Sequence, residues 1–184
     1  MSWANESDIQ SRQFRCGFCG SFVATRKGFH SQTHSHFKIH ICPHCDKPTF
    51  FDGSSGAQVP GVTPGNEVNH LPQQLETLFK EARLCVSANA YTASVLACRK
   101  LLMHIAVQKQ AEEGKGFLFY VEYLADKGYV PPNGKGWVDH IRKKGNEATH
   151  EIVLMKKDDA EELIAFVEML LKFIYEFPAR VPSP

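Results

Sequence analysis

The sequence has little net charge and no long apolar run. The first feature argues against a general affinity for nucleic acid, and the second argues against a membrane-spanning helix. Its 21 Lys and Arg residues nearly balance its 20 Asp and Glu residues, leaving a formal charge of +1 at pH 7. A nucleic-acid site would therefore be a local patch. No apolar segment approaches the roughly 20 residues that span a bilayer, and residues 1–10 are too polar for a secretory signal. We expect a cytoplasmic protein without a membrane-spanning segment.

Cysteine is present six times, and in a reducing compartment it is more often a metal ligand or a small buried residue than a disulfide partner. Four cysteines form two pairs, Cys16-x2-Cys19 and Cys42-x2-Cys45. Each pair places two thiolates on one tight turn, and two such turns complete the tetrahedral ligand set of Zn²⁺. A redox CxxC is the alternative, but it uses one motif beside a βαβ unit, which this sequence lacks. We predict one structural zinc ion per chain.

Histidines gather in the same region, at His30, His34, His36, His40 and His44. A second metal site is one interpretation, but four thiolates already fill a tetrahedral shell. We expect these histidines to be exposed residues of a β-hairpin. The alternative is a weakly basic face for phosphate, shared with Arg26, Lys27 and Lys38.

Composition predicts two domains joined by a linker. We expect a flexible N-terminus at 1–11, a β zinc ribbon at 12–52 and a linker rich in Gly, Pro and Ser at 53–66. A helical bundle should cover 67–180, followed by a short tail at 181–184. The fold class is therefore a small β ribbon followed by an all-α antiparallel bundle.

Apolar residues recur at helical spacing throughout the second domain. We predict five helices. The first begins near Pro72, the second spans about 91–110, and the third ends at Gly128. The fourth includes Trp137, and the fifth starts at a capping box of Asp158 and Glu161. Cys85 and Cys98 occupy apolar helix positions and should be core residues. Arg99, on a mostly apolar helix, should pair with Glu81.

The segment LPQQLETLFKEARLCVSANAYTASVLACRKLL, followed by GYVPP and IRKKGNEATH, resembles a domain-of-unknown-function family of the HEPN superfamily. The resemblance covers about 71–179 and is sharpest at Glu81-Ala82, Arg99 and Gly145-Asn146-x3-His150. It implies an antiparallel helical bundle that pairs as a homodimer. Such domains occur in prokaryotes fused to type I restriction R subunits, alone, or beside zinc ribbons.

Many HEPN domains are metal-independent ribonucleases with an Arg-x4–6-His motif in which a polar residue follows the arginine. The resemblance places Asn146 at the polar position and His150 at the histidine, while Gly145 stands where the arginine should be. The nearest upstream arginine, Arg142, gives the longer spacing Arg-x7-His. His150 is therefore a structural residue near a helix end, a general acid or base, or a ligand contact.

These features together favour a binding or adaptor module over a strong enzyme. The resemblance implies a link to prokaryotic nucleic-acid metabolism or antiphage defence, with RNA or DNA as candidate partners. One alternative is a dimeric, metal-independent ribonuclease that uses His150 with Arg142 and Asn146. The other is a structural module whose bundle dimerises while the ribbon docks a protein partner.

Overall fold

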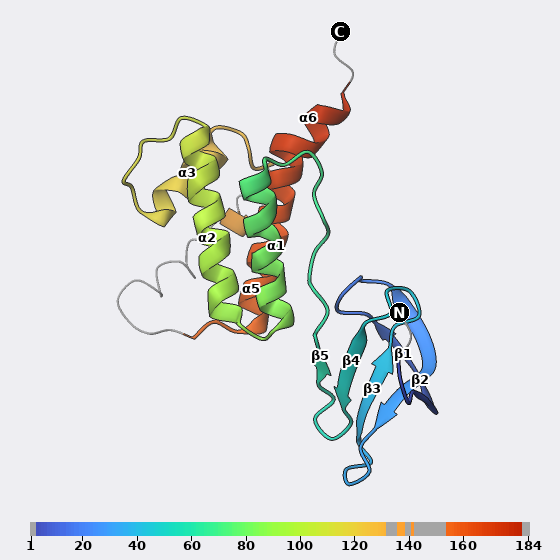
Figure 1. Ribbon diagram of the computed structural model, residues 1–184. Coiled ribbons are helices and arrows are strands. Elements are labelled where there is room, and N and C mark those ends of the chain that lie inside the picture. The colour runs from blue at the N-terminus through green and yellow to red at the C-terminus, as the bar shows by residue number, and fades with distance from the viewer. Residues whose placement is uncertain (1–2, 132–135, 139–140, 142–153, 182–184) are drawn as a thin grey trace. The chain divides into compact units, whose positions relative to one another are not determined.

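The computed structural model describes residues 3–131, 136–138, 141 and 154–181. These residues form two compact units, the first built mainly from the chain up to residue 63 and the second mainly from residue 64 onward. The first unit is made of strands and the second of helices (Figure 1). No described helix is long and apolar enough to cross a bilayer.

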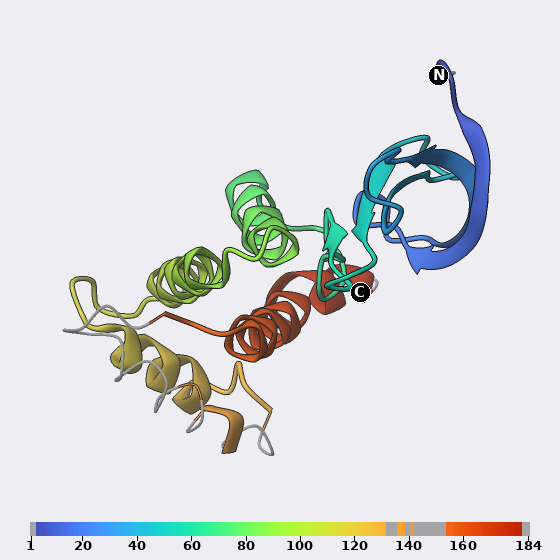
Figure 2. The same cartoon turned by 90° about the horizontal axis from the view of Figure 1, so that it is seen from below.

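The first unit is a five-stranded antiparallel sheet in which neighbouring strands are also consecutive along the chain. Its strands are β1 (Ser7–Arg15), β2 (Phe22–His30), β3 (Phe37–Ile41), β4 (Pro48–Asp52) and β5 (Gln58–Val59). Viewed along the strands, the sheet curls strongly around its inner face (Figure 2). Both CxxC motifs lie in this unit, so the sheet carries the cysteine cluster.

Strand β1 starts earlier than the composition predicted. Residues 7–11, expected to be flexible, belong to β1, in which Ser7 and Asp8 pair with Gly28 and Lys27 of β2 before an irregularity that ends at Arg12. β1 lies at the edge of the sheet and buries only Phe14. An edge strand with one buried residue keeps a polar sequence, which is why it resembled a flexible terminus.

The predicted linker at 53–66 is also more structured than its Gly and Pro content suggested. Val59 pairs with Phe50, so β5 lies inside the segment. At the other end, the backbone amide and the side-chain amide of Asn66 are hydrogen bonded to Glu168 of the helical unit. The Gly and Pro residues of this segment therefore form turns, and strand pairing and hydrogen bonds hold both of its ends in place.

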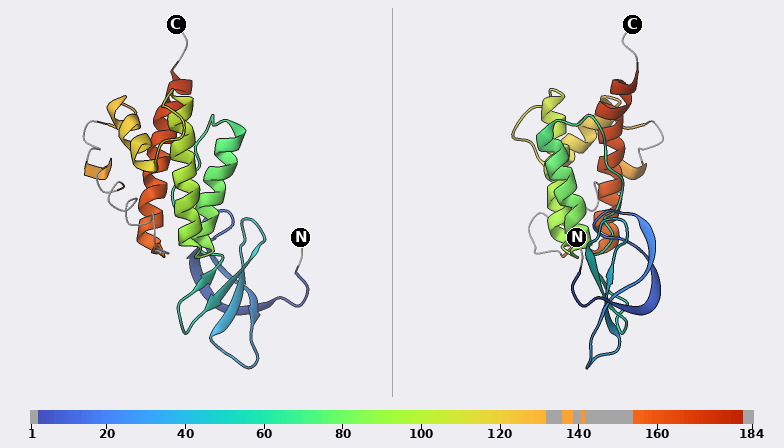
Figure 3. Two further views of the ribbon diagram at one scale, coloured as in Figure 1. Left: turned by 90° about the vertical axis from the view of Figure 1, so that its left-hand side faces the viewer. Right: turned by 45° about the vertical axis from the view of Figure 1, so that its right-hand side comes forward.

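The second unit is helical. Its elements are α1 (Gln73–Ser87), α2 (Tyr91–Gln108), α3 (Phe117–Asp126) and α5 (Lys157–Leu171), which continues through a π-helical turn, η2 (Lys172–Glu176), into α6 (Phe177–Arg180). Helices α1, α2 and α5 lie side by side in two views, and α2 also packs against α3 (Figures 1 and 3). Residues 136–138 and 141 are helical as well.

Helix ends follow the chemistry that the sequence predicted, with one exception. Gly128 has a φ of +77° and ends α3, because its amide bonds to Ala125 and that of Tyr129 to Leu124, both at 3.0 Å. At the start of α5, Lys156 is the N-cap and its amide donates to the Asp159 carboxylate at 2.9 Å. The capping residues are therefore Lys156 and Asp159, each two positions before its counterpart in the predicted pair of Asp158 and Glu161.

The helical core forms where the apolar stripes of four helices meet. α2 lies centrally and buries residues on most of its circumference, including Cys98, as predicted. Cys85, predicted to be in the core, is only half-buried. Most of the remaining core side chains come from the other helices: Leu75, Phe79, Ala82, Val86, Phe117, Tyr120, Val121, Leu124, Ala160, Leu163, Ile164, Phe166, Val167, Leu170 and Leu171.

An extended strap, residues 64–70, precedes α1 and is fixed to two helices. Arg83 of α1 donates to the carbonyl oxygens of Pro64 and Gly65 at 2.8 and 3.0 Å. On the other side, the buried carboxylates of Glu168 and Glu176 accept hydrogen bonds from the backbone amides of Asn66 and Asn69. These contacts satisfy backbone groups that no strand or helix partner serves.

Candidate metal centre

The four paired cysteines converge at one end of the sheet. Their sulfur atoms all lie within 4.8 Å of one another. Cys16 Sγ is 3.7 Å from Cys45 Sγ, and Cys19 Sγ is 3.8 Å from Cys42 Sγ. A disulfide needs about 2.05 Å between sulfurs, so neither pair is bonded. The prediction that the two motifs meet is confirmed.

The spacing of these sulfurs fits a tetrahedral metal. With metal–sulfur bonds of about 2.3 Å, the edge of a regular tetrahedron is about 3.8 Å. The distances of 3.7 and 3.8 Å match that edge. The cluster could therefore hold a metal ion that takes four thiolate ligands, a coordination that zinc favours.

Two similar turns position the ligands. In the first knuckle, residues 16–21, the Gly20 amide donates to the Cys16 carbonyl and the Cys16 amide to the Ser21 carbonyl, each at 2.9 Å. In the second knuckle, residues 42–47, the Asp46 amide donates to the Cys42 carbonyl at 2.8 Å, and the Cys42 amide bonds to Lys47 at 3.0 Å. The two knuckles are thus built alike.

Each knuckle contains one residue with a positive φ, Gly20 at 70° and Asp46 at 58°. Glycine adopts this conformation freely and Asp tolerates it better than most other residues, so the aspartate is a signal that the sequence analysis did not use. Gly17 has a different role. A Cβ there would lie 2.4 Å from the carbonyl oxygens of Pro60 and Gly61, so a larger residue would displace that backbone.

The thiols differ in their acidity. Burial by itself raises the pKa of Cys19, but hydrogen bonds from Ser21 and from the neighbouring cysteines lower it overall to about 6. Burial raises the pKa of Cys45 to about 12. A bound cation would favour the thiolate form of every ligand, so metal binding at this cluster releases protons and weakens in acid.

Little else holds this end of the sheet together. The buried cluster around the sulfurs consists of Phe14, Val23 and Phe51 with Cys16 and Cys42. An apolar core of this size stabilises a small unit weakly, whereas a structural zinc can supply roughly 10–16 kcal/mol of apparent folding free energy. Two of the metal-ligand candidates, Cys16 and Cys42, are therefore also part of the buried core of this unit.

The histidine-rich segment does not join the cluster, which among the described residues contains only the four cysteines. His30, His34, His36 and His44 are exposed, as predicted. His40 is the correction: it is fully buried and packs against the rings of Phe14 and Phe51, which also contact each other. β3 alternates between the two faces of the sheet, which turns this histidine inward.

His40 has a polar ring in an apolar place. Burial lowers its pKa, with smaller contributions from Arg12 and Lys38 that outweigh a weak contact with the Thr25 backbone. Neither ring nitrogen has a well-formed hydrogen bond within the described part of the chain, nor does the Thr49 hydroxyl opposite it in β4. The imidazole is therefore held neutral inside the sheet.

The residues proposed for ribonuclease chemistry, Arg142, Asn146 and His150, lie outside the described residues, as does Gly145. Arg99 is described and differs from expectation. Its guanidinium lies 4.6 Å from the centre of the Phe117 ring, and burial lowers its pKa. Within the described part of the chain, Arg99 therefore contacts the Phe117 ring of α3 and forms no ion pair with Glu81.

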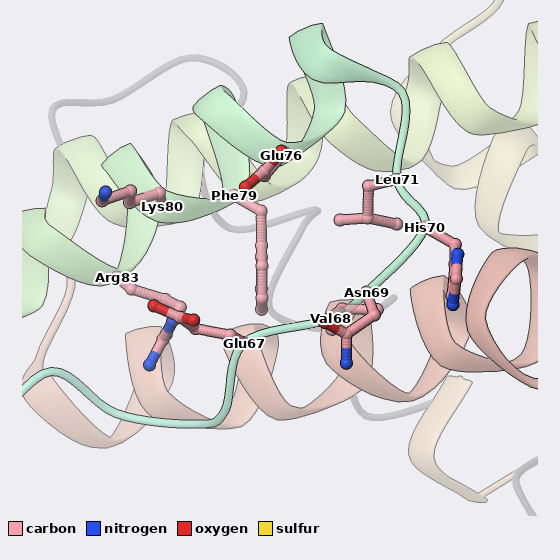
Figure 4. A pocket seen from close by; sticks show the side chains of 9 residues that line it. All are labelled: Glu67, Val68, Asn69, His70, Leu71, Glu76, Phe79, Lys80 and Arg83. Carbon is pink, nitrogen blue, oxygen red and sulfur yellow. The ribbon is translucent and has the colours of Figure 1, made fainter.

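A pocket lies in the helical unit, between the strap and α1 (Figure 4). Its volume is about 160 Å³, with His70 at one end and Lys80 at the other. Arg83 also lines it but donates to strap carbonyls and contacts the Phe79 ring at 5.7 Å. None of its lining residues is a predicted site residue, and the pocket is part of the strap's attachment to α1.

The helical unit supplies the family relationship. Residues 80–183 match the family described as Domain of unknown function (DUF4145). The chain belongs to the DUF4145 family. Comparisons with curated proteins and with solved structures found no match. The DUF4145 region begins inside α1 and includes α2, α3 and α5, whereas all four cysteines of the cluster lie before it.

Proposed function

We propose that Cys16, Cys19, Cys42 and Cys45 hold one structural zinc ion in a ribbon that serves binding rather than catalysis. The observation that carries the proposal is the match between the sulfur spacings of 3.7 and 3.8 Å and the edge of a zinc–thiolate tetrahedron. Catalytic zinc keeps one position open for water or substrate, whereas four protein ligands leave none.

The whole protein is, in this proposal, a binding or adaptor module of prokaryotic nucleic-acid metabolism or antiphage defence. The resemblance of the helical unit to HEPN domains supports that context, and membership of the DUF4145 family is consistent with it. The arrangement of α1, α2 and α5 side by side fits a HEPN-like bundle. The ribbon would provide one binding surface and the bundle another.

The bundle would pair with a second copy through the outer face of its last long helix. Ala165, Met169, Phe173 and Phe177 recur every four residues and line one shallow groove of about 310 Å³, together with the ion-paired Glu168 and Lys172. Phe173 and Phe177 remain 47% and 43% exposed, although their rings contact each other at 5.5 Å. Apolar stripes of this kind mark helix–helix contacts.

Residue size along this stripe suits a two-fold, antiparallel pairing. In such a pair the same surface of both copies meets itself. Ala165 of one copy would lie opposite Phe177 of the other, and Met169 opposite Phe173. The small Ala165 would then face the large Phe177, and the flexible Met169 could adapt to the ring of Phe173. This geometry supports the homodimer that the HEPN resemblance implies.

A cleavage assay separates this adaptor from the rival ribonuclease. The rival would use His150 with Arg142 and Asn146, but Gly145 replaces the arginine of the motif. Loss of one stabilising donor commonly costs about 10²–10³ in rate. We expect weak or no cleavage of structured and single-stranded RNA without added metal. Robust cleavage that disappears in Arg142→Ala and His150→Ala, with unchanged melting temperatures, would contradict the adaptor proposal.

A further inference from the structure

Two phenylalanines, one within the first knuckle and one directly after it, are exposed to solvent. Phe18 lies between the ligands Cys16 and Cys19 and is 47% exposed, while Phe22 follows the knuckle and is 71% exposed. Phe22 is the most exposed phenylalanine in the described part of the chain. Neither ring contributes to the buried cluster around the sulfurs. Their exposure therefore has no explanation in the packing of the sheet.

The sheet register places a cation beside Phe22. Phe22 is directly opposite Arg15 in the β1–β2 pair. The next pair along, Phe14 and Val23, is buried, and neighbouring pairs in a sheet point to opposite faces. Arg15 and Phe22 thus lie on the outer face, next to each other.

Phe18 has a cation of its own. The ammonium group of Lys47, at the end of the second knuckle, lies 5.0 Å from the centre of the Phe18 ring. Each exposed ring therefore has a basic side chain as neighbour. Within the described residues, neither Arg15 nor Lys47 forms an ion pair with a carboxylate.

Carboxylates of this unit are mostly engaged elsewhere. Glu6 pairs with Lys27 at 2.9 Å and Asp8 with Arg26 at 4.0 Å. Asp52 accepts hydrogen bonds from Ser54 and Ser55, which hold its pKa well below the usual range. The fourth carboxylate, Asp46, is next to Lys47 in the sequence, but the two side chains form no ion pair with each other in the described structure. The positive charge of Arg15 and Lys47 is thus available at the edge of the cluster.

We propose that the first knuckle binds single-stranded nucleic acid. Phe18 and Phe22 stack on unpaired bases, and Arg15 and Lys47 contact the neighbouring phosphates. This inference rests on the proposed adaptor function and names its ligand class. A duplex buries the faces of its bases, so it offers nothing for the two rings to stack on. Stacking is tolerant of sequence, so no base preference is expected.

The charge of the site sets how strong its salt dependence can be. A zinc ion with four thiolates carries a formal charge of −2, equal in size to the combined +2 of Arg15 and Lys47. With about two phosphate contacts, the logarithm of the association constant should fall with the logarithm of salt concentration with a slope of about −1.4. Stacking, rather than charge, should therefore carry most of the affinity.

The experiment measures fluorescence anisotropy of labelled strands with the full-length, zinc-loaded protein. The probes are oligo-dT and oligo-U of about 12 nucleotides, and a duplex of the same length. We expect both single strands to bind more tightly than the duplex. Phe22→Ala and Phe18→Ala should each weaken binding by about 5- to 150-fold, as expected for losing one stacked base.

Phe119→Ala is the matched control, because Phe119 is 37% exposed but belongs to α3 of the helical unit. It should leave binding unchanged, and all variants should keep their zinc. The proposal is wrong if no single strand binds, if binding ignores both knuckle variants, or if the duplex binds equally well. Self-association that Phe22→Ala abolishes, without strand binding, would assign the rings to a protein interface. The zinc site and the adaptor proposal are tested by other measurements, zinc content and RNA cleavage, so failure of this proposal would leave both standing.

Discussion

Asn66 donates two hydrogen bonds to the carboxylate of Glu168, from its backbone amide at 2.8 Å and from its side chain at 3.0 Å. Roughly two turns further along the same helix, Glu176 accepts a hydrogen bond from the Asn69 amide at 3.0 Å. Each carboxylate also pairs with a basic residue one turn later, Lys172 or Arg180. Two buried acids therefore attach the strap to the helical unit.

Replacing Glu168 by glutamine should destabilise the helical unit. The variant keeps the shape but loses the charge that accepts three hydrogen bonds, and bonds to charged groups are worth about 1.5–3 kcal/mol each. We expect the unfolding free energy to fall by about that amount in urea denaturation followed by helical circular dichroism. Glu161→Gln is the control, because that residue forms only a partly exposed ion pair with Lys157. It should cost less than about 0.5 kcal/mol.

Acid should weaken the same attachment. Burial by itself raises the pKa of Glu168, but hydrogen bonds from Lys172 and Asn66 outweigh it and hold the pKa below the ordinary value. A lowered pKa gives a stability contribution that is complete above the unfolded pKa of about 4.3 and is lost as the pH falls through the folded value. Wild type should therefore lose more unfolding free energy below pH 4.5 than Glu168→Gln does. Parallel pH profiles for the two proteins would show that Glu168 is not the group responsible.

The helical unit should fold without the ribbon, provided that the strap stays attached. A chain beginning at Pro64 retains the partners of Arg83, Glu168 and Glu176, and it should melt cooperatively and ignore a zinc chelator. A chain beginning at Leu71 leaves both buried acids without their strap amides and should be less stable. Equal melting temperatures for the two chains would mean that the strap contributes nothing. A non-cooperative transition in the longer chain would mean that the two units share a core.

How much of this could be predicted varies with the range of the interaction. Ligand spacing and the glycine that ends α3 are local signals, and the CxxC pairs and Gly128 were identified from the sequence. The strap was not identified, because Asn66 and Glu168 are far apart in the chain. Nothing in the sequence around a glutamate shows whether it is buried or exposed. Periodicity likewise predicted the apolar face of α5. It could not show that Phe173 would remain exposed.

Phe173 provides the test of dimerisation. Phe173→Glu puts a charge at the centre of the stripe formed by Ala165, Met169, Phe173 and Phe177, and burying an unpaired charge is strongly unfavourable. We expect sedimentation equilibrium to show a dimer for the wild type and a monomer for this variant. Phe119→Glu, on another helix, should remain dimeric. A wild-type monomer at micromolar concentration would refute the pairing.

The zinc centre is the central claim, and elemental analysis of the purified protein tests it most directly. Wild type should contain one zinc per chain, and Cys42→Ser should lose it because three thiolates and a hydroxyl make a much poorer site. Cys85→Ser is the matched control, since Cys85 is a free cysteine outside the cluster and its loss should leave the zinc content at one. A zinc content near zero in the wild type, or an unchanged content in Cys42→Ser, would contradict the account.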